Sequence, residues 1–242
     1  RVLKALKEVQ EREFPALLLR IDSPGGTVGD SQEIYAALLR LREKGCHVVA
    51  SFGNISASGG VYVGVAAETI VSNPGTITGS IGVILRGNNL SKLLDRVGVK
   101  FETVKSGAFK DILSPDRALG AEERELLQAL IDSSYEQFVA AVAEGRKLDP
   151  SRVREFADGR VFSGAQAKDL GLVDELGDEE CARVLAAQLA DLDEERCRVV
   201  TLGKLRKPLL QGLSGSNLLA RIQELVTVEM ELSGQPLWLF RP

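Results

Sequence analysis

The strongest structural signal in this chain is the stretch Phe52-Gly53-Asn54-Ile55-Ser56-Ala57-Ser58-Gly59-Gly60-Val61-Tyr62. A largely apolar, β-branched run (47–50) enters it, and a run of small and apolar residues (61–67) follows. This pattern predicts a buried strand, a tight turn and then a helix. Ser58 is expected at the start of that helix, where backbone N–H groups have no partner within the helix.

Ser58 has two interpretations. A serine at such a turn can act as a nucleophile, and the N–H of Gly59 could bind the oxyanion that develops on an attacked carbonyl. Serine is also a preferred helix N-cap, and the glycines could serve packing only. The stretch by itself favours the cap, so the choice depends on the rest of the chain.

The residues before this stretch predict a parallel sheet. An apolar run over 14–21 ends in the turn Asp22-Ser23-Pro24-Gly25-Gly26, which indicates a buried strand. A helix is expected from Asp30 or Ser31 to Lys44, and the next strand over 46–51. Strand–helix–strand is the signature of a parallel sheet with helical crossovers, so the predicted fold class is α/β.

The same alternation continues after Ser58. We expect strands over 69–72, 79–85, 99–105 and 198–202, and helices over 3–13, 90–97, 121–144, 179–190 and 218–232. The last helix and the apolar run 236–240 need a surface to cover them, either on this domain or on a neighbouring subunit.

Composition excludes several classes of protein. The chain has 242 residues, a net charge of −4, 44% hydrophobic and 26% charged residues, which is ordinary for a globular protein and argues against nucleic acid as a partner. No run reaches the roughly 18 apolar residues of a membrane helix. Because the chain starts at Arg1, we expect a fragment whose signal or anchor lies outside this sequence.

Metal and cofactor chemistry has no support in the sequence. The three cysteines, Cys46, Cys181 and Cys197, lack metal-ligand spacing and are expected to be free thiols. His47 is the only histidine, which makes a zinc site improbable. There is no Gly-x-Gly-x-x-Gly or Walker sequence, so nucleotide binding is not expected either.

A nucleophilic Ser58 needs a base. His47 lies at the far end of the strand that leads to Ser58, and at about 3.3 Å per residue it is out of hydrogen-bond reach. Lysine must lose its usual charge to act as a base, which desolvation favours. Lys110 lies between the apolar pairs 108–109 and 112–113, although the spacing alone slightly favours a surface lysine paired with Asp111.

The Gly25-Gly26 turn is a second candidate for the site, because α/β sheets bind their ligands at the carboxyl ends of strands. Two glycines in succession can turn a backbone N–H into the site and let an extended peptide lie alongside. The alternative is a simple turn, which these residues by themselves favour.

Several motifs occur together in this chain. They are Asp22-Ser23-Pro24-Gly25-Gly26, Ser56-Ala57-Ser58-Gly59-Gly60-Val61-Tyr62, Thr78-Gly79-Ser80-Ile81-Gly82, Lys105-Ser106-Gly107-Ala108-Phe109-Lys110-Asp111-Ile112-Leu113-Ser114-Pro115, and parts of 158–174. Together they resemble the short, single-unit form of the bacterial signal peptide peptidase A (SppA) family, over about residues 15–177.

The resemblance implies a Ser–Lys dyad without a cofactor or metal. By motif, Ser58 matches the nucleophile, Lys110 the general base, and Ser80 the serine that orients the lysine. Gly59 and the Gly25-Gly26 turn match the oxyanion hole, with Gly25 favoured over Gly26 as the donor. The implied fold is the ClpP/crotonase-type spiral of repeated strand–strand–helix units.

The resemblance also implies an organisation. Residues 1–177 would form the protease domain, and 178–242 a C-terminal extension (helix, strand, helix) on that domain or on a neighbouring subunit. Relatives of this form resemble membrane-anchored homo-oligomers with the catalytic domain on the extracytoplasmic side and active sites completed between subunits. The substrates would be remnant signal peptides and other extended apolar peptides.

Other functions remain open at this point. A crotonase-type acyl-CoA enzyme uses a similar oxyanion hole but needs acidic residues that the turn lacks. A ClpP-like Ser-His-Asp protease is disfavoured because no histidine follows Ser58. A catalytically inactive scaffold subunit is the third alternative.

Overall fold

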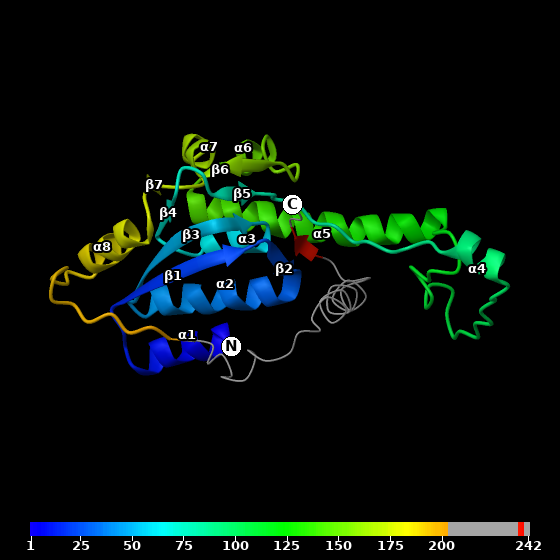
Figure 1. The fold of residues 1–242 in the computed structure, drawn as a ribbon, viewed down its shortest axis with the longest axis horizontal. Coiled ribbons are helices and arrows are strands. Elements are labelled where there is room, and N and C mark those ends of the chain that lie inside the picture. The colour runs from blue at the N-terminus through cyan, green and yellow to red at the C-terminus, as the bar shows by residue number, and fades with distance from the viewer. Residues whose placement is uncertain (203–236, 240–242) are drawn as a thin grey trace, which may run out of the picture. The chain divides into compact units, whose positions relative to one another are not determined.

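The computed structural model describes residues 1–202 and 237–239 (Figure 1). The chain divides into two compact units. Unit 1 comprises Arg1–Val83, Ser134–Lys204 and Leu237–Pro242, and unit 2 comprises Ile84–Ser133 and Leu205–Pro236. Each unit is described by itself.

A mixed sheet forms the centre of unit 1. Its strands are β1 (Ala16–Ser23), β3 (His47–Ala57), β4 (Thr69–Ser72), β5 (Ile77–Gly79), β6 (Val161–Ser163) and β7 (Glu175–Leu176). The order is β6-β5-β3-β4-β7, and β1 also pairs with β3. Every pairing is parallel except β5 with β6. The α/β class predicted from the sequence is thereby confirmed.

The longest strand, β3, connects the core to the turn at Ser58. Its first part pairs with β1 and β4, and its last residues, Ile55–Ala57, pair with β5. The register with β1 shifts after Ile21, so that Ser23 lies opposite Ser56. As a result the Gly25-Gly26 turn after β1 and the Ser58 turn after β3 leave the same end of the sheet.

Helices cover both faces of this sheet (Figure 1). The unit contains α1 (Val2–Glu11), α2 (Val28–Glu43), α3 (Gly59–Gly64), the later part of α5 (Ala121–Arg146), α6 (Pro150–Arg154), α7 (Gly164–Asp169) and α8 (Glu179–Leu189). Leu38 of α2, Val61 of α3 and Phe138 of α5 share the main core cluster. On the other face α8 packs against β3 and β4.

The continuous apolar run in β3 follows from this two-sided cover. Val48, Ala50 and Phe52 belong to the main cluster, whereas Val49 belongs to the cluster under α8. Alternate residues of a strand point to opposite faces. Because both faces are buried, apolar side chains occur on both, and Ser51 is a buried polar exception.

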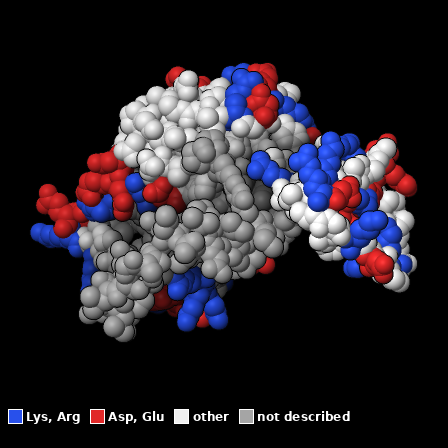
Figure 2. All heavy atoms as spheres, turned by 45° about the vertical axis from the view of Figure 1, so that its right-hand side comes forward, with Lys and Arg blue, Asp and Glu red and all other residues white. Residues whose placement is uncertain are grey.

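Unit 2 contains α4 (Ser91–Val97), a long loop segment and the first turns of α5. Gly98, with φ of 72°, ends α4 after Val97, which is the end expected for the helix over 90–97. On the face shown in Figure 2, positively and negatively charged side chains are interspersed rather than gathered by sign.

A small second sheet lies in unit 1. Strand β2 (Gly25–Thr27) pairs antiparallel with β8 (Leu237–Leu239), with Gly25 opposite Leu239 and Thr27 opposite Leu237. The glycine turn that follows β1 is therefore one side of a two-stranded ribbon whose other side is the chain's own C-terminal segment.

Some local predictions were wrong. The runs 99–105 and 198–202 are not strands, because within the described residues neither has a pairing partner. The strand expected over 79–85 ends at Gly79, since Gly79 and Ser80 both have positive φ. Helix α2 begins at Val28 with Thr27 as its N-cap, instead of Asp30 or Ser31. The helix expected over 218–232 lies outside the described residues.

Within residues 1–202 and 237–239, no helix is both long and apolar enough to span a lipid bilayer.

Candidate active site

Ser58 occupies the sharp turn between β3 and α3. Its backbone has φ of 54° and ψ of −117°, a left-handed conformation that is unfavourable for residues other than glycine. Hydrogen bonds hold it on both sides: its N–H donates to the Gly79 carbonyl (2.8 Å), and its own carbonyl accepts from Tyr62 N–H (3.0 Å). Strain that the surrounding structure maintains in this way is typical of functional positions.

The Ser58 hydroxyl is buried and unsatisfied. The residue is 1% exposed, and among the described residues its Oγ has no hydrogen-bond partner. Although Ser58 holds the N-cap position of α3, its side chain makes no capping hydrogen bond. The capping interpretation is therefore wrong. A buried hydroxyl without a partner is costly, and its retention calls for a chemical explanation.

The Gly25-Gly26 turn lies against the start of α3. A Cβ atom placed on Gly59 would be 3.0 Å from the Gly26 nitrogen, 3.4 Å from the Gly25 Cα and 2.7 Å from the Ser31 Oγ. The two backbones approach this closely only because Gly59 has no side chain. Gly25 itself has φ of 122°, a conformation open to glycine and unfavourable for other residues. The structure thus brings Gly25, Gly26 and Gly59 together beside Ser58.

Ser80 belongs to the same unit as Ser58. It directly follows Gly79, whose carbonyl accepts the Ser58 N–H, and it is 7% exposed with φ of 51°. Its N–H donates to the Arg160 carbonyl (2.7 Å). Two successive residues with positive φ therefore connect the turn at Ser58 to the loop before β6.

Lys110 lies in unit 2, whereas Ser58 lies in unit 1. It is exposed, and its N–H donates to the Gly107 carbonyl (3.2 Å). Within the described part of the chain, its side chain makes no hydrogen bond or ion pair. The prediction of a surface lysine is confirmed by this exposure, but the predicted pairing with Asp111 is wrong, because Asp111 pairs with Lys105 and Arg117.

His47 has a structural partner. Its Nδ1 lies 3.1 Å from Glu68 Oε2, at the opposite end of β3 from Ser58. The neighbouring Cys46 is buried, and burial, reinforced by the charge of Glu68, raises the pKa of its thiol to about 11. Neither residue lies near the candidate site.

Sequence reasoning missed two parts of this site. Ser31 lies beside Gly59, and its Oγ donates to the Thr27 carbonyl (2.9 Å), which ties the first turn of α2 to β2. The second is the pairing of Leu237–Leu239 with β2. Its only signal in the sequence was an apolar C-terminal run that needed a surface.

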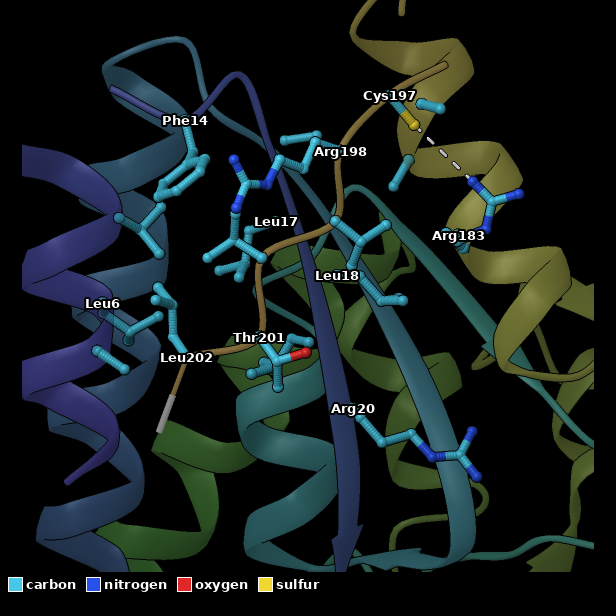
Figure 3. Close-up of a pocket in the computed structure, with 18 of the residues that line it drawn as sticks. Leu6, Phe14, Leu17, Leu18, Arg20, Arg183, Cys197, Arg198, Thr201 and Leu202 are labelled. Carbon is cyan, nitrogen blue, oxygen red and sulfur yellow. Dashed lines mark hydrogen bonds between the residues drawn. The ribbon is translucent and has the colours of Figure 1, made fainter. Parts of the chain in front are cut away.

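A separate apolar cavity of about 440 Å³ lies at the other end of β1 (Figure 3). Its walls come from α1, the first residues of β1, α8 and the segment 197–202. Arg183 Nη1 reaches Cys197 Sγ (3.8 Å) on one side. None of Ser58, Ser80, Gly25, Gly26 or Gly59 lines this cavity.

In the described parts of the chain, no group of three or more His, Cys, Asp or Glu side chains is arranged to hold a metal ion.

With this geometry in place, comparison with known proteins decides the family. The model of peptidase family S49 matches residues 40–193, which include Ser58, Ser80 and Lys110. The chain belongs to peptidase family S49. It is therefore a protease with peptide substrates, and its resemblance to the SppA family and the ClpP/crotonase-type fold are confirmed.

Named relatives agree with this assignment. A putative protease of Synechocystis is 58% identical, with 99% of this chain and 90% of the relative aligned. A putative signal peptide peptidase SppA of Enterococcus faecium is 41% identical over 74% of this chain, and Protease 4 of Salmonella typhi is 40% identical over 74%. The aligned parts are 53% and 29% of those two relatives, so this S49 peptidase spans only part of their length.

Proposed function

We propose that this S49 peptidase is a serine endopeptidase with a Ser–Lys dyad, in which Ser58 is the nucleophile and Lys110 the general base. The observation that carries the proposal is the Ser58 hydroxyl. It is buried without a partner among the described residues, on a strained turn, and next to three glycines whose backbones approach closely.

The reaction proceeds in two steps. The neutral amine of Lys110 accepts the hydroxyl proton of Ser58 while Oγ attacks the scissile carbonyl, and the leaving amine takes a proton from the resulting ammonium. Water then hydrolyses the ester of Ser58 with the same amine as base. The N–H of Gly59 and one N–H of the Gly25-Gly26 turn stabilise the oxyanion in both steps. Ser80 orients the lysine.

The substrate is an extended apolar peptide, with cleaved signal peptides as the natural class. Strand β2 includes Gly25 and Gly26 of the glycine turn, and in this structure it pairs with an extended segment, Leu237–Leu239. An extended substrate can add to the same three residues by main-chain hydrogen bonds, as in other cases of β-strand addition. Such pairing would carry its scissile bond past Ser58.

The assembly is a homo-oligomer in which a neighbouring subunit completes each site. Lys110 is exposed and belongs to a different compact unit from Ser58, which supports a base supplied across a subunit contact. By analogy with the SppA relatives, residues 1–177 act as the protease domain, 178–242 as an extension, and a segment outside this sequence anchors the protein with its catalytic domain on the extracytoplasmic side.

The first prediction tests the dyad. Ser58→Ala and Lys110→Ala should each abolish hydrolysis of a fluorogenic apolar peptide, while the melting temperature stays close to that of the parent protein. The matched control is His47→Ala, which should retain turnover because His47 lies far from Ser58 along β3. Full activity of Lys110→Ala would overturn the dyad.

The acyl-CoA enzyme and the inactive scaffold are distinguished from the protease by different observations. Membership of a peptidase family excludes the acyl-CoA enzyme. The inactive scaffold is tested by a serine-directed covalent probe: labelling of Ser58 in the assembled protein supports the enzyme, and its absence together with the absence of turnover supports the scaffold.

A further inference from the structure

Four charged side chains form a continuous network in unit 2, around the loop that carries Lys110. Lys105 Nζ lies 2.6 Å from Asp111 Oδ1, and Arg117 Nη2 lies 2.9 Å from the same oxygen. The Arg117 guanidinium also binds Glu123, with Nη1 donating to Oε2 at 2.8 Å. Arg117 is therefore clamped between two carboxylates.

This network fixes the loop backbone as well as the side chains. Arg117 Nη2 donates to the Asp111 carbonyl (3.2 Å), and Lys105 Nζ donates to the Ala108 carbonyl (2.9 Å). At the other end, Glu123 Oε2 accepts from the Gly120 N–H (2.8 Å), at the start of α5. The loop is in this way tied to the first turn of a long helix.

Few backbone hydrogen bonds reach beyond the loop itself. Residues 106–115 belong to no strand or helix, and in the described part of the chain most of their backbone hydrogen bonds are short-range turns such as Ile112 N–H to the Phe109 carbonyl. The exception is the Leu90 N–H, which donates to the Pro115 carbonyl (2.6 Å). The network, by contrast, is sheltered: the side chains of Glu123, Asp111 and Arg117 are 9%, 16% and 33% exposed. Two-pronged arginine–carboxylate contacts of this kind are geometrically specific, unlike single exposed ion pairs.

The network also determines which charges can reach Lys110. Asp111 is its sequence neighbour, and a carboxylate paired with a lysine favours the charged ammonium. Here Lys105 and Arg117 occupy both Asp111 oxygens. Their hydrogen bonds hold the pKa of Asp111 well below its usual range, so the carboxylate stays ionised and engaged. The amine of Lys110 is left without a competing partner among the described residues.

We propose that Arg117 is a positioning residue for Lys110: by clamping Asp111 to Glu123 it fixes the loop that presents the amine and keeps Asp111 from pairing with it. The inference rests on the proposed Ser–Lys dyad. It assigns Arg117 no contact with the substrate.

The test separates positioning from binding. Arg117→Ala should lower kcat about a hundredfold, the cost typical of a misplaced catalytic group, with KM changed less than about twofold because β2 and Ser58 are untouched. Arg117→Lys should restore part of kcat, since lysine keeps the positive charge but cannot make the two-pronged contact of a guanidinium with a carboxylate. Arg124→Ala is the matched control: Arg124 is exposed on the turn of α5 that carries Glu123, without a side-chain partner in the described residues.

A second variant tests the same role for the case in which Arg117→Ala fails to fold. Glu123→Gln keeps an oxygen for the Gly120 N–H but removes the charge that holds Arg117, and it should also lower kcat without raising KM. Unchanged kcat in Arg117→Ala and Glu123→Gln, with Lys110→Ala inactive, overturns this inference and leaves the dyad standing. Full activity of Lys110→Ala overturns the dyad itself.

Discussion

The backbone conformation of Ser58, more than its residue type, distinguishes it from an ordinary helix N-cap. Its N–H and carbonyl are bound to Gly79 and Tyr62, and its hydroxyl has no partner among the residues that the structure describes. A serine that merely capped α3 would turn its Oγ back to the helix N–H groups. Here Oγ makes no capping hydrogen bond, and its burial keeps it from bulk water.

The sequence predicted the position of Ser58 but not its conformation. A strand, a small-residue turn and a helix were visible in the pattern of residues 47–67. Positive φ at a serine was not visible, because it depends on the Gly79 carbonyl, which β5 supplies from later in the chain. The proximity of Ser31 to Gly59 was hidden for the same reason, since it depends on packing between two turns.

A substitution at Gly59 should damage catalysis more than folding. In Gly59→Ala the new Cβ would lie 2.7 Å from the Ser31 Oγ and 3.0 Å from the Gly26 nitrogen, so the Ser31 side chain must turn away and the Gly26 backbone must shift by a few tenths of an ångström. We expect kcat to fall at least a hundredfold, the usual cost of losing one oxyanion donor. Steady-state kinetics with a thermal melt measure both effects.

The double variant Ser31→Ala with Gly59→Ala provides the control for this crowding. It removes the nearest contact but leaves the Gly26 backbone in place, so kcat should recover only in part. Full activity of the single variant would mean that the glycine contact is dispensable.

At the scale of elements, sequence patterns succeeded where a segment's own residues fix its structure. Strand β4 and helix α4 were predicted within a residue of their bounds. A proline-glycine turn follows β4, and a glycine in the left-handed conformation ends α4. The runs 99–105 and 198–202 alternate like strands but have no partner in the described residues. A strand exists only with a neighbour, and local alternation cannot supply one.

The ion-pair partners around the Lys110 loop could not be predicted from local sequence either. Asp111 was the obvious local partner for Lys110, yet its actual partners are Lys105 and Arg117. Arg117 also reaches Glu123 on α5. No spacing rule for helices or strands applies across such a loop, so only the three-dimensional arrangement reveals the network.

The Arg117–Glu123 contact makes the stability of unit 2 depend on pH in the acid range. Hydrogen bonds from Arg117, then from the Gly120 N–H, lower the pKa of Glu123 from 4.5 to about 2. Its contribution to stability is therefore complete above about pH 4.5 and is lost as the pH falls towards 2. Hydrogen exchange of residues 106–123 should increase across this window. In Glu123→Gln that pH dependence should be weaker, and an identical acid profile for both proteins would contradict the assignment.

At the scale of the whole molecule, the chain's own C-terminal segment occupies the strand proposed to bind substrate. Leu237–Leu239 pairs with Gly25–Thr27, beside the glycines next to Ser58. A substrate that adds to β2 must displace this segment, so the two compete for the same main-chain groups.

Removal of residues 237–242 should therefore raise the apparent affinity for peptide. We expect KM for a fluorogenic apolar peptide to fall severalfold in the truncated protein, with kcat little changed, because Ser58 and Lys110 remain. Trp238→Ala in the full chain is the matched control, since it keeps the backbone pairing. An unchanged or higher KM after truncation would show that the segment does not compete.

The division of the chain into two compact units has a consequence for how the enzyme comes into being. Unit 2 interrupts unit 1 in the chain, since Ser134–Lys204 of unit 1 follow Lys110. Unit 1 can therefore complete its fold only after residues 84–133 have been synthesised. Under the proposed dyad, the general base already exists in the chain by the time the turn at Ser58 is formed.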